Sequence, residues 1–200
     1  MENKNLQVQS QNSNLQLTKQ KNILSKYCIN ESEIKLVNAV FSNNVLNMND
    51  LIDVVAKWKW MVGVVNNNQS EDDTAQELAL LSTFIYNTYN SLKIDEINLA
   101  IQLSLSNKLD CDVNTYNSFS PLYVSRILNA YLEYKRKINS DITERKLIED
   151  NKEMRENIAE FLELSDYEVL VAENGKVGIA LVQKENPDLI MPRNLTSASV

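Results

Sequence analysis

The chain has 200 residues, of which 44% are hydrophobic and 24% are charged, and its net charge is −7. This is the composition of a soluble globular protein, and the start of the chain is polar, so we expect a cytoplasmic protein with neither a signal peptide nor a membrane span. The sequence has no histidine and only two cysteines, which excludes histidine-based acid–base catalysis and disfavours a structural zinc site.

The first part of the chain predicts an arm followed by helices. Residues 1–21 are rich in Asn, Gln, Ser and Lys and predict a disordered arm. Beyond them, apolar residues recur at spacings of three and four, which predicts a five-helix domain over residues 22–138. The helices are expected at about residues 31–41, 51–62, 70–89, 94–107 and 121–137.

Helix start signals support these assignments. Asn30 precedes the first periodic run, and Asn49 or Asp50 precedes the second. Ser70 is followed by three acidic residues, which has the shape of a capping box with carboxylates near the positive end of the helix dipole. These polar residues are therefore predicted to be N-caps.

A change in residue usage predicts a domain boundary near residues 138–146. Four of the six Gly and Pro residues lie in the last 26 positions, and the net charge is −1 over residues 1–140 but −6 over residues 141–200. We therefore expect an arm, a helical domain, a linker, a second folded segment and a tail at residues 1–21, 22–138, 139–143, 144–192 and 193–200.

The second segment alternates between predicted strands and helices. Strands are expected over residues 145–148, 167–172 and 188–190. The helix after the first strand carries an apolar stripe of Met154, Ile158, Phe161 and Leu162. In order and spacing this segment resembles the first half of a bacterial response-regulator receiver domain of the chemotaxis type. The resemblance implies a partial parallel sheet of strand order 2-1-3, so the expected fold is mainly α with a truncated receiver-like α/β segment.

The resemblance also implies a vestigial site. In receivers an acidic pair after the first strand binds Mg²⁺, which assigns Glu149 and Asp150 to metal. The phosphoacceptor aspartate of the family follows the third strand, but here a Met-Pro pair comes directly after Ile190. Asp188 lies at the wrong end of that strand to replace it. We therefore expect no phosphoacceptor, no catalytic residue and no cofactor beyond weakly held Mg²⁺.

Basic and aromatic residues in the helical domain permit a second interpretation. Arg126, Lys135, Arg136 and Lys137, with nearby tyrosines, could line a nucleic-acid groove, although such a cluster also suits a solvated helix end. The domain faintly resembles small replication-associated proteins of phages and mobile elements, over residues 99–103, 108–110 and 119–131.

The two tryptophans of the second predicted helix are only two positions apart. We expect one of Trp58 and Trp60 to lie in the core and the other at its edge. A platform on which nucleic-acid bases stack is the alternative interpretation of this pair.

Two functional hypotheses follow. The first is a non-enzymatic protein related to two-component phosphorelay signalling, unable to accept phosphate and acting through a protein partner or self-association. The second is a DNA-replication accessory module in the helical domain, with the receiver-like segment an incidental fusion. The polar start and the lack of a long apolar run predict no contact with a membrane in either case.

Overall fold

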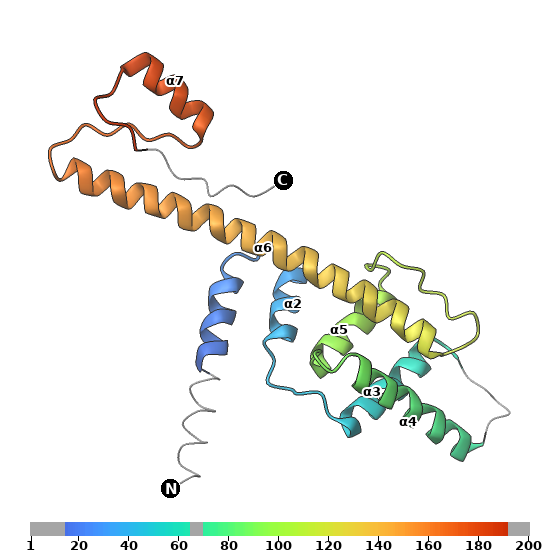
Figure 1. Ribbon diagram of the computed structural model, residues 1–200. Helices are drawn as coiled ribbons and strands as arrows, with labels where there is room; N and C mark the ends of the chain where they lie inside the picture. The colour runs from blue at the N-terminus through green and yellow to red at the C-terminus, as the bar shows by residue number, and fades with distance from the viewer. Residues whose placement is uncertain (1–14, 65–69, 192–200) are drawn as a thin grey trace, which may run out of the picture. The chain divides into compact units, whose positions relative to one another are not determined.

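Every regular element in the described part of the chain is an α-helix. The computed structural model describes residues 15–64 and 70–191, and within these ranges it contains seven helices and no strand. The helices are one at residues 15–25, α2 (Glu31–Val40), α3 (Met48–Met61), α4 (Glu71–Thr88), α5 (Ile94–Leu105), α6 (Pro121–Glu163) and α7 (Gly175–Glu185) (Figure 1). The predicted α/β segment with its partial parallel sheet is therefore wrong, and the described fold is all-α.

Polar side chains start the helices as the sequence predicts, with one shift. The side-chain oxygens of Asn30 and Ser70 accept hydrogen bonds from backbone N–H groups at the starts of α2 and α4, which confirms both as N-caps. Helix α3 begins earlier than expected, because Asn47 is its cap and accepts from the backbone N–H of Asp50. The start of α7 is capped in the same way by Asn174.

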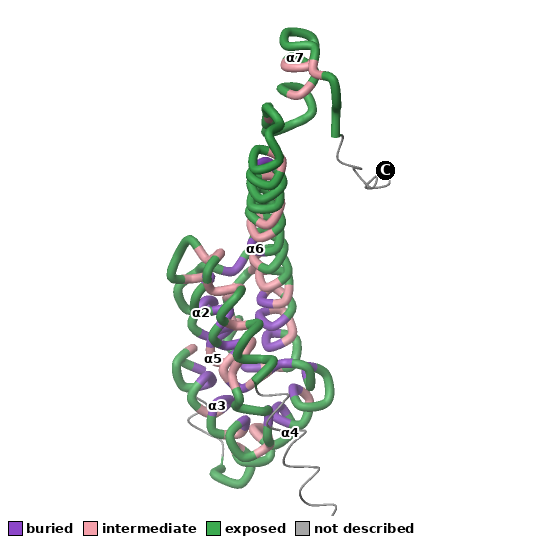
Figure 2. Tube along the Cα trace, turned by 90° about the vertical axis from the view of Figure 1, so that its left-hand side faces the viewer, coloured by how far each residue is buried: buried purple, intermediate pink, exposed green. Residues whose placement is uncertain are grey.

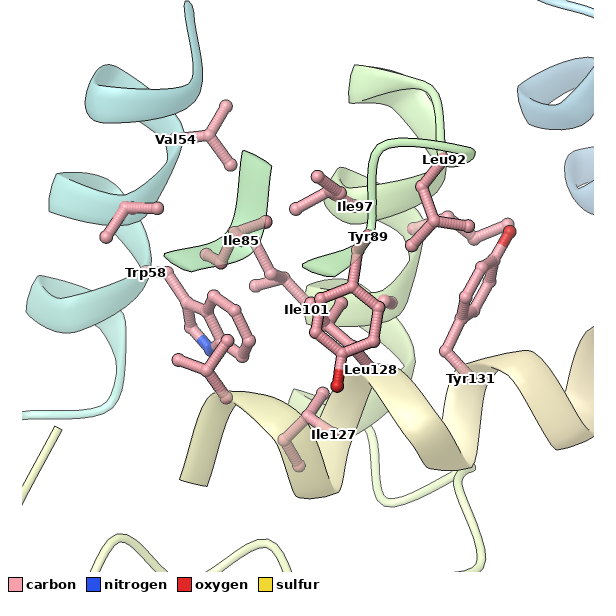
Figure 3. Packing of buried hydrophobic residues seen from close by; sticks show 14 of the residues in the cluster. Val54, Trp58, Ile85, Tyr89, Leu92, Ile97, Ile101, Ile127, Leu128 and Tyr131 are labelled. Carbon is pink, nitrogen blue, oxygen red and sulfur yellow. The ribbon is translucent and has the colours of Figure 1, made fainter. Parts of the chain in front are cut away.

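The chain divides into two units, and the first, Met1–Lys146, holds the hydrophobic core. In it α3 packs on α4 and α5, and α2 packs on α5. Trp58 lies fully buried, with its ring centroid 5.4 Å from that of Phe119 and 5.8 Å from that of Tyr123. Figure 3 shows Trp58 in the same cluster as Ile85 and Leu128, so side chains from α3, α4 and α6 share one core.

The first part of α6 is fixed to this core by packing and by two ion pairs. Its inner face is buried and consists of Tyr123, Val124, Ile127, Leu128, Tyr131 and Ile142. Lys135 Nζ lies 2.7 Å from a carboxylate oxygen of Glu96 in α5, and Arg145 Nη2 lies 2.7 Å from one of Glu33 in α2. Both carboxylates are almost wholly buried, so each cation balances a charge that is removed from water.

The carboxylate of Glu33 also holds the start of α2. It accepts from the backbone N–H of Ile29 at 2.9 Å and from the Asn30 amide at 3.0 Å. Asn30 in turn caps the backbone N–H of Glu33 at 2.9 Å. This is a reciprocal capping arrangement to which the guanidinium of Arg145 is added.

The continuity of α6 explains why the predicted sheet does not form. Residues 139–143, expected as a linker, and residues 145–148, expected as the first strand, lie inside this 43-residue helix. No Pro or Gly occurs between Pro121 and Gly175, so nothing in the backbone stops the helix after residue 138. In the strand order 2-1-3 the first strand is central, and its loss leaves the other two without a pairing partner. Residues 167–172 and 188–190 are accordingly neither helix nor strand.

The second unit, Leu147–Val200, has almost no buried side chains where it is described. Ala159 is the one buried residue among residues 147–191, and α7 contains none. Figure 2 shows the change in colour along α6, from purple and pink stretches to a mostly exposed end. Residues 15–21 of the predicted arm belong to the first helix, whereas residues 1–14 and the predicted tail at 193–200 lie outside the described residues.

Candidate functional site

The acidic pair that the receiver resemblance assigned to Mg²⁺ lies on a helix. Glu149 and Asp150 occupy consecutive positions of α6, where successive side chains diverge by about 100° around the axis. They do not follow a strand, so the expected placement of the pair at the edge of a sheet is wrong. Within residues 15–64 and 70–191 no group of three or more His, Cys, Asp or Glu side chains is arranged to hold a metal ion.

Treatment with a small phosphodonor such as acetyl phosphate, in the presence of Mg²⁺, is expected to leave the intact protein without an acyl phosphate. The physical reason is that an attacking carboxylate needs a metal beside it to neutralise the phosphoryl oxygens, and α6 separates the two acids that would provide it. Intact-mass spectrometry before and after hydroxylamine measures this directly. A hydroxylamine-sensitive phosphate that disappears in Asp150→Asn or in Asp188→Asn would contradict the expectation.

Of the basic residues proposed for nucleic acid, Arg126 is bound to a loop of its own chain. Its Nη1 donates to the backbone carbonyls of Asp112 and Asn114 at 3.1 and 3.3 Å and lies 3.3 Å from the Asp112 carboxylate. Its guanidinium carbon is also 5.9 Å from the ring centroid of Tyr116. Hydrogen bonds from Tyr116 and the backbone of Asn114 hold the pKa of Asp112 below its usual range, so this acid stays charged beside the arginine.

Lys135 takes part in a buried polar cluster between α5 and α6. Glu96 is 1% exposed, and its carboxylate accepts from Lys135 Nζ at 2.7 Å, from the hydroxyl of Tyr131 at 3.2 Å and from the backbone N–H of Lys93 at 3.1 Å. Burial, with the nearby Glu96 carboxylate, raises the pKa of Tyr131, so its hydroxyl remains a donor. This cluster could not be predicted from the sequence, because a single Glu on an apolar helix usually faces solvent.

The remaining two cations lie at the surface of α6. Arg136 forms an ion pair with Glu133, one turn earlier on the same helix, and Lys137 is exposed. Three of the four predicted nucleic-acid contacts therefore already pair with acids of their own chain. The structure does not bring the four together as a free basic surface.

An open groove of about 610 Å³ lies along the last part of α6. Its apolar lining consists of Met154, Ile158, Phe161, Leu162 and Met191. The first four recur at intervals of four, three and one residues and so share one face of the helix. They are the apolar stripe predicted from the sequence, and in the structure three of its members, Met154, Ile158 and Phe161, are exposed.

Acidic side chains border the groove and dominate its surroundings. Asp150 and Glu153 lie at its start, and Asn157 is the third polar residue of the lining. Residues 147–200 carry 11 Asp and Glu against five Lys and Arg, a net charge of −6. One of these cations, Arg155, donates from Nη1 to the backbone carbonyl of Glu173 at 2.9 Å and thus holds the chain before α7.

No family model, no curated protein and no solved structure matches the chain. The receiver resemblance therefore depends on residues 144–192 of this sequence alone. In the described ranges, no helix is both long enough and apolar enough to cross a membrane.

Proposed function

We propose that this chain is a non-enzymatic interaction protein that binds another protein through the described part of its second unit, residues 147–191. The observation that carries the proposal is the exposure of apolar side chains there. Fourteen large apolar residues between Leu147 and Met191 are each at least 41% exposed, while Ala159 is the one buried residue of that stretch.

Four of these residues, Met154, Ile158, Phe161 and Met191, line one groove and are therefore not isolated on the surface. Monomeric proteins seldom expose contiguous apolar patches beyond a few hundred Å², and larger ones mark interaction sites. Removing apolar surface from water contributes roughly 25 cal/mol per Å² of stabilising free energy. Binding of a partner would therefore provide burial energy that the second unit does not obtain by folding on itself. The first unit also exposes apolar side chains, such as Trp60 and Leu122, but unlike the second unit it has a core in which many apolar residues form one buried cluster.

The charge of the second unit supports a protein partner over a nucleic acid or an anionic membrane. A net charge of −6 over residues 147–200 repels phosphate groups, and affinity for DNA depends mainly on cations that neutralise them. The ion pairs of Arg126 and Lys135 within the first unit remove two of the candidate contacts. The absence of histidine from the sequence is consistent with a binding role.

The proposed role in signalling is supported only by the amino-acid sequence. The resemblance of residues 144–192 to a receiver segment favours a role beside a two-component phosphorelay, in which the chain binds without accepting phosphate. The receiver fold is not part of this proposal, because the described residues of the segment contain no strand.

Selection of ligands from a random peptide library displayed on phage tests this function on the full chain. Bound peptides are expected to slow hydrogen exchange within residues 147–191, because these amides flank the surface that becomes covered. Phe161→Ser is expected to weaken binding by about tenfold or more, the cost of roughly one apolar anchor. Leu122→Ser is the matched control: both residues lie on α6, and they are 69% and 71% exposed.

The proposal fails if the selected peptides protect only residues 15–146, or if both serine variants bind equally well. It also fails if no peptide binds while duplex DNA does, with an affinity that falls steeply as salt is raised. That last result would support the replication-accessory interpretation instead.

A further inference from the structure

We infer that the groove along the last part of α6 receives an amphipathic helix of another protein, with an apolar stripe flanked by Lys and Arg. This inference deepens the proposed function, on which it rests, by naming the chemistry and the secondary structure of the partner. Three observations carry it: the shape of the groove, the charge around it and the backbone that forms it.

The groove has the dimensions of a helix-binding site. Along α6 it extends from Asp150 to Leu162, about 18 Å at the helical rise per residue, which matches roughly three turns of a docked helix. Such a helix presents anchors at positions i, i+4 and i+7, the same spacing as Met154, Ile158 and Phe161.

The charge around the groove favours a basic partner over a second copy of this chain. Asp150 and Glu153 line the groove itself, and Glu149, Glu156, Glu160 and Glu163 are exposed elsewhere on this stretch of α6. Two copies brought together here would each add net negative charge to the interface, and juxtaposed like charges disfavour association. A Lys- and Arg-bearing helix instead neutralises the carboxylates while its apolar stripe covers the floor.

The backbone of the second unit favours a helix over an extended peptide. Addition of a strand requires a sheet edge with unpaired N–H and C=O groups, and residues 147–191 contain no strand. Helix α6 uses its backbone groups internally and offers side chains only. Met154 and Met191 contribute unbranched thioether side chains, which adjust to the shape of an incoming apolar residue.

Fluorescence anisotropy with designed peptides tests the inference on the full chain. The probe is a labelled amphipathic Leu/Lys peptide of about 18 residues, roughly five helical turns. A Leu/Glu peptide with the same pattern and a scrambled Leu/Lys peptide are the controls. The amphipathic Leu/Lys peptide is expected to bind about tenfold or more tightly than either, and its affinity is expected to fall as salt rises.

Variants locate the site. Ile158→Ser is expected to weaken binding about tenfold by removing an anchor, and the double reversal Asp150→Lys with Glu153→Lys is expected to weaken it comparably, because both acids line the groove. Asp141→Lys with Glu144→Lys is the matched control for charge, because both residues are exposed on α6 but precede the groove. Equal affinity of all variants for the Leu/Lys peptide overturns the inference by showing nonspecific attraction.

Other outcomes separate the inference from the function on which it rests. If analytical ultracentrifugation shows a dimer that Ile158→Ser dissociates, and the Leu/Lys peptide does not bind, a second copy is the occupant and the inference is wrong. The interaction function survives that result. If the Leu/Lys peptide does not bind and library peptides protect only residues 15–146, both the inference and the proposed function fail.

Discussion

Replacing Trp58 by alanine is expected to lower the free energy of unfolding by about 3–5 kcal/mol. The indole is fully buried and contacts the rings of Phe119 and Tyr123, so its removal leaves a cavity between α3 and the start of α6. Rigid neighbours on several sides limit collapse into that cavity, which places the expected loss in the range for large aromatic residues. Urea denaturation of the full chain, followed by far-ultraviolet circular dichroism, measures the loss.

The same helix provides the control. Trp60 is two residues further along α3 and 76% exposed, so Trp60→Ala is expected to change the free energy of unfolding by no more than about 0.5 kcal/mol. Comparable losses for the two alanine variants would mean that Trp60 is covered in solution, contrary to this structure. They would also favour the alternative interpretation of Trp58 and Trp60 as a platform on which nucleic-acid bases stack.

Replacing Lys135 by methionine is expected to lower the free energy of unfolding by about 2–3 kcal/mol. Methionine keeps most of the length of the side chain but leaves the carboxylate of Glu96, which is 1% exposed, without its cation. Removing one partner of a buried ion pair typically costs about 3–5 kcal/mol. Lys135 is partly exposed, so the expected loss lies at or below the lower end of that range. Urea denaturation again measures the change.

Two further variants show whether the charge itself is responsible. Lys137→Met removes an exposed lysine from the same helix and is expected to be nearly neutral. Adding Glu96→Gln to Lys135→Met is expected to recover more than half of the loss, because an amide needs no counter-charge. Equal effects of the two methionine variants would argue that Lys135 is a surface residue, as the nucleic-acid interpretation requires.

The helices of the first unit were predictable because their signals are local. Ser70 and the periodic apolar residues after it predicted a helix over residues 70–89, and α4 covers Glu71–Thr88. The predicted helix at 94–107 corresponds to α5, Ile94–Leu105. Caps and one-sided apolar periodicity depend on neighbours in sequence, so they survive without knowledge of the tertiary contacts.

The course of the chain after residue 138 was not predictable in this way. Short apolar runs such as Leu147–Ile148 suit a strand or a helix equally, and only their surroundings decide. Here the absence of Pro and Gly between residues 121 and 175 lets α6 continue through them. The resemblance to a receiver favoured the strand and outweighed this local signal.

Only part of the candidate site could be predicted from the sequence. The apolar stripe of Met154, Ile158 and Phe161 was recognised from its spacing, but a pattern of this kind shows which residues share a face and not what covers them. The sheet expected above the stripe is absent from the described residues. The ion pairs of the buried carboxylates of Glu33 and Glu96 had no local signal, because their partners, Arg145 and Lys135, are distant in sequence.

The position of Glu33 restricts how this chain can diverge. Its carboxylate accepts hydrogen bonds from the backbone N–H of Ile29, from the side-chain amide of Asn30 and from the guanidinium of Arg145, which lies 112 residues later in the chain. Aspartate is too short to keep all three bonds, and glutamine lacks the charge that the arginine requires. Homologues are therefore expected to retain or exchange residues 33 and 145 together. An aligned set of homologues in which residues 33 and 145 change independently would contradict this expectation.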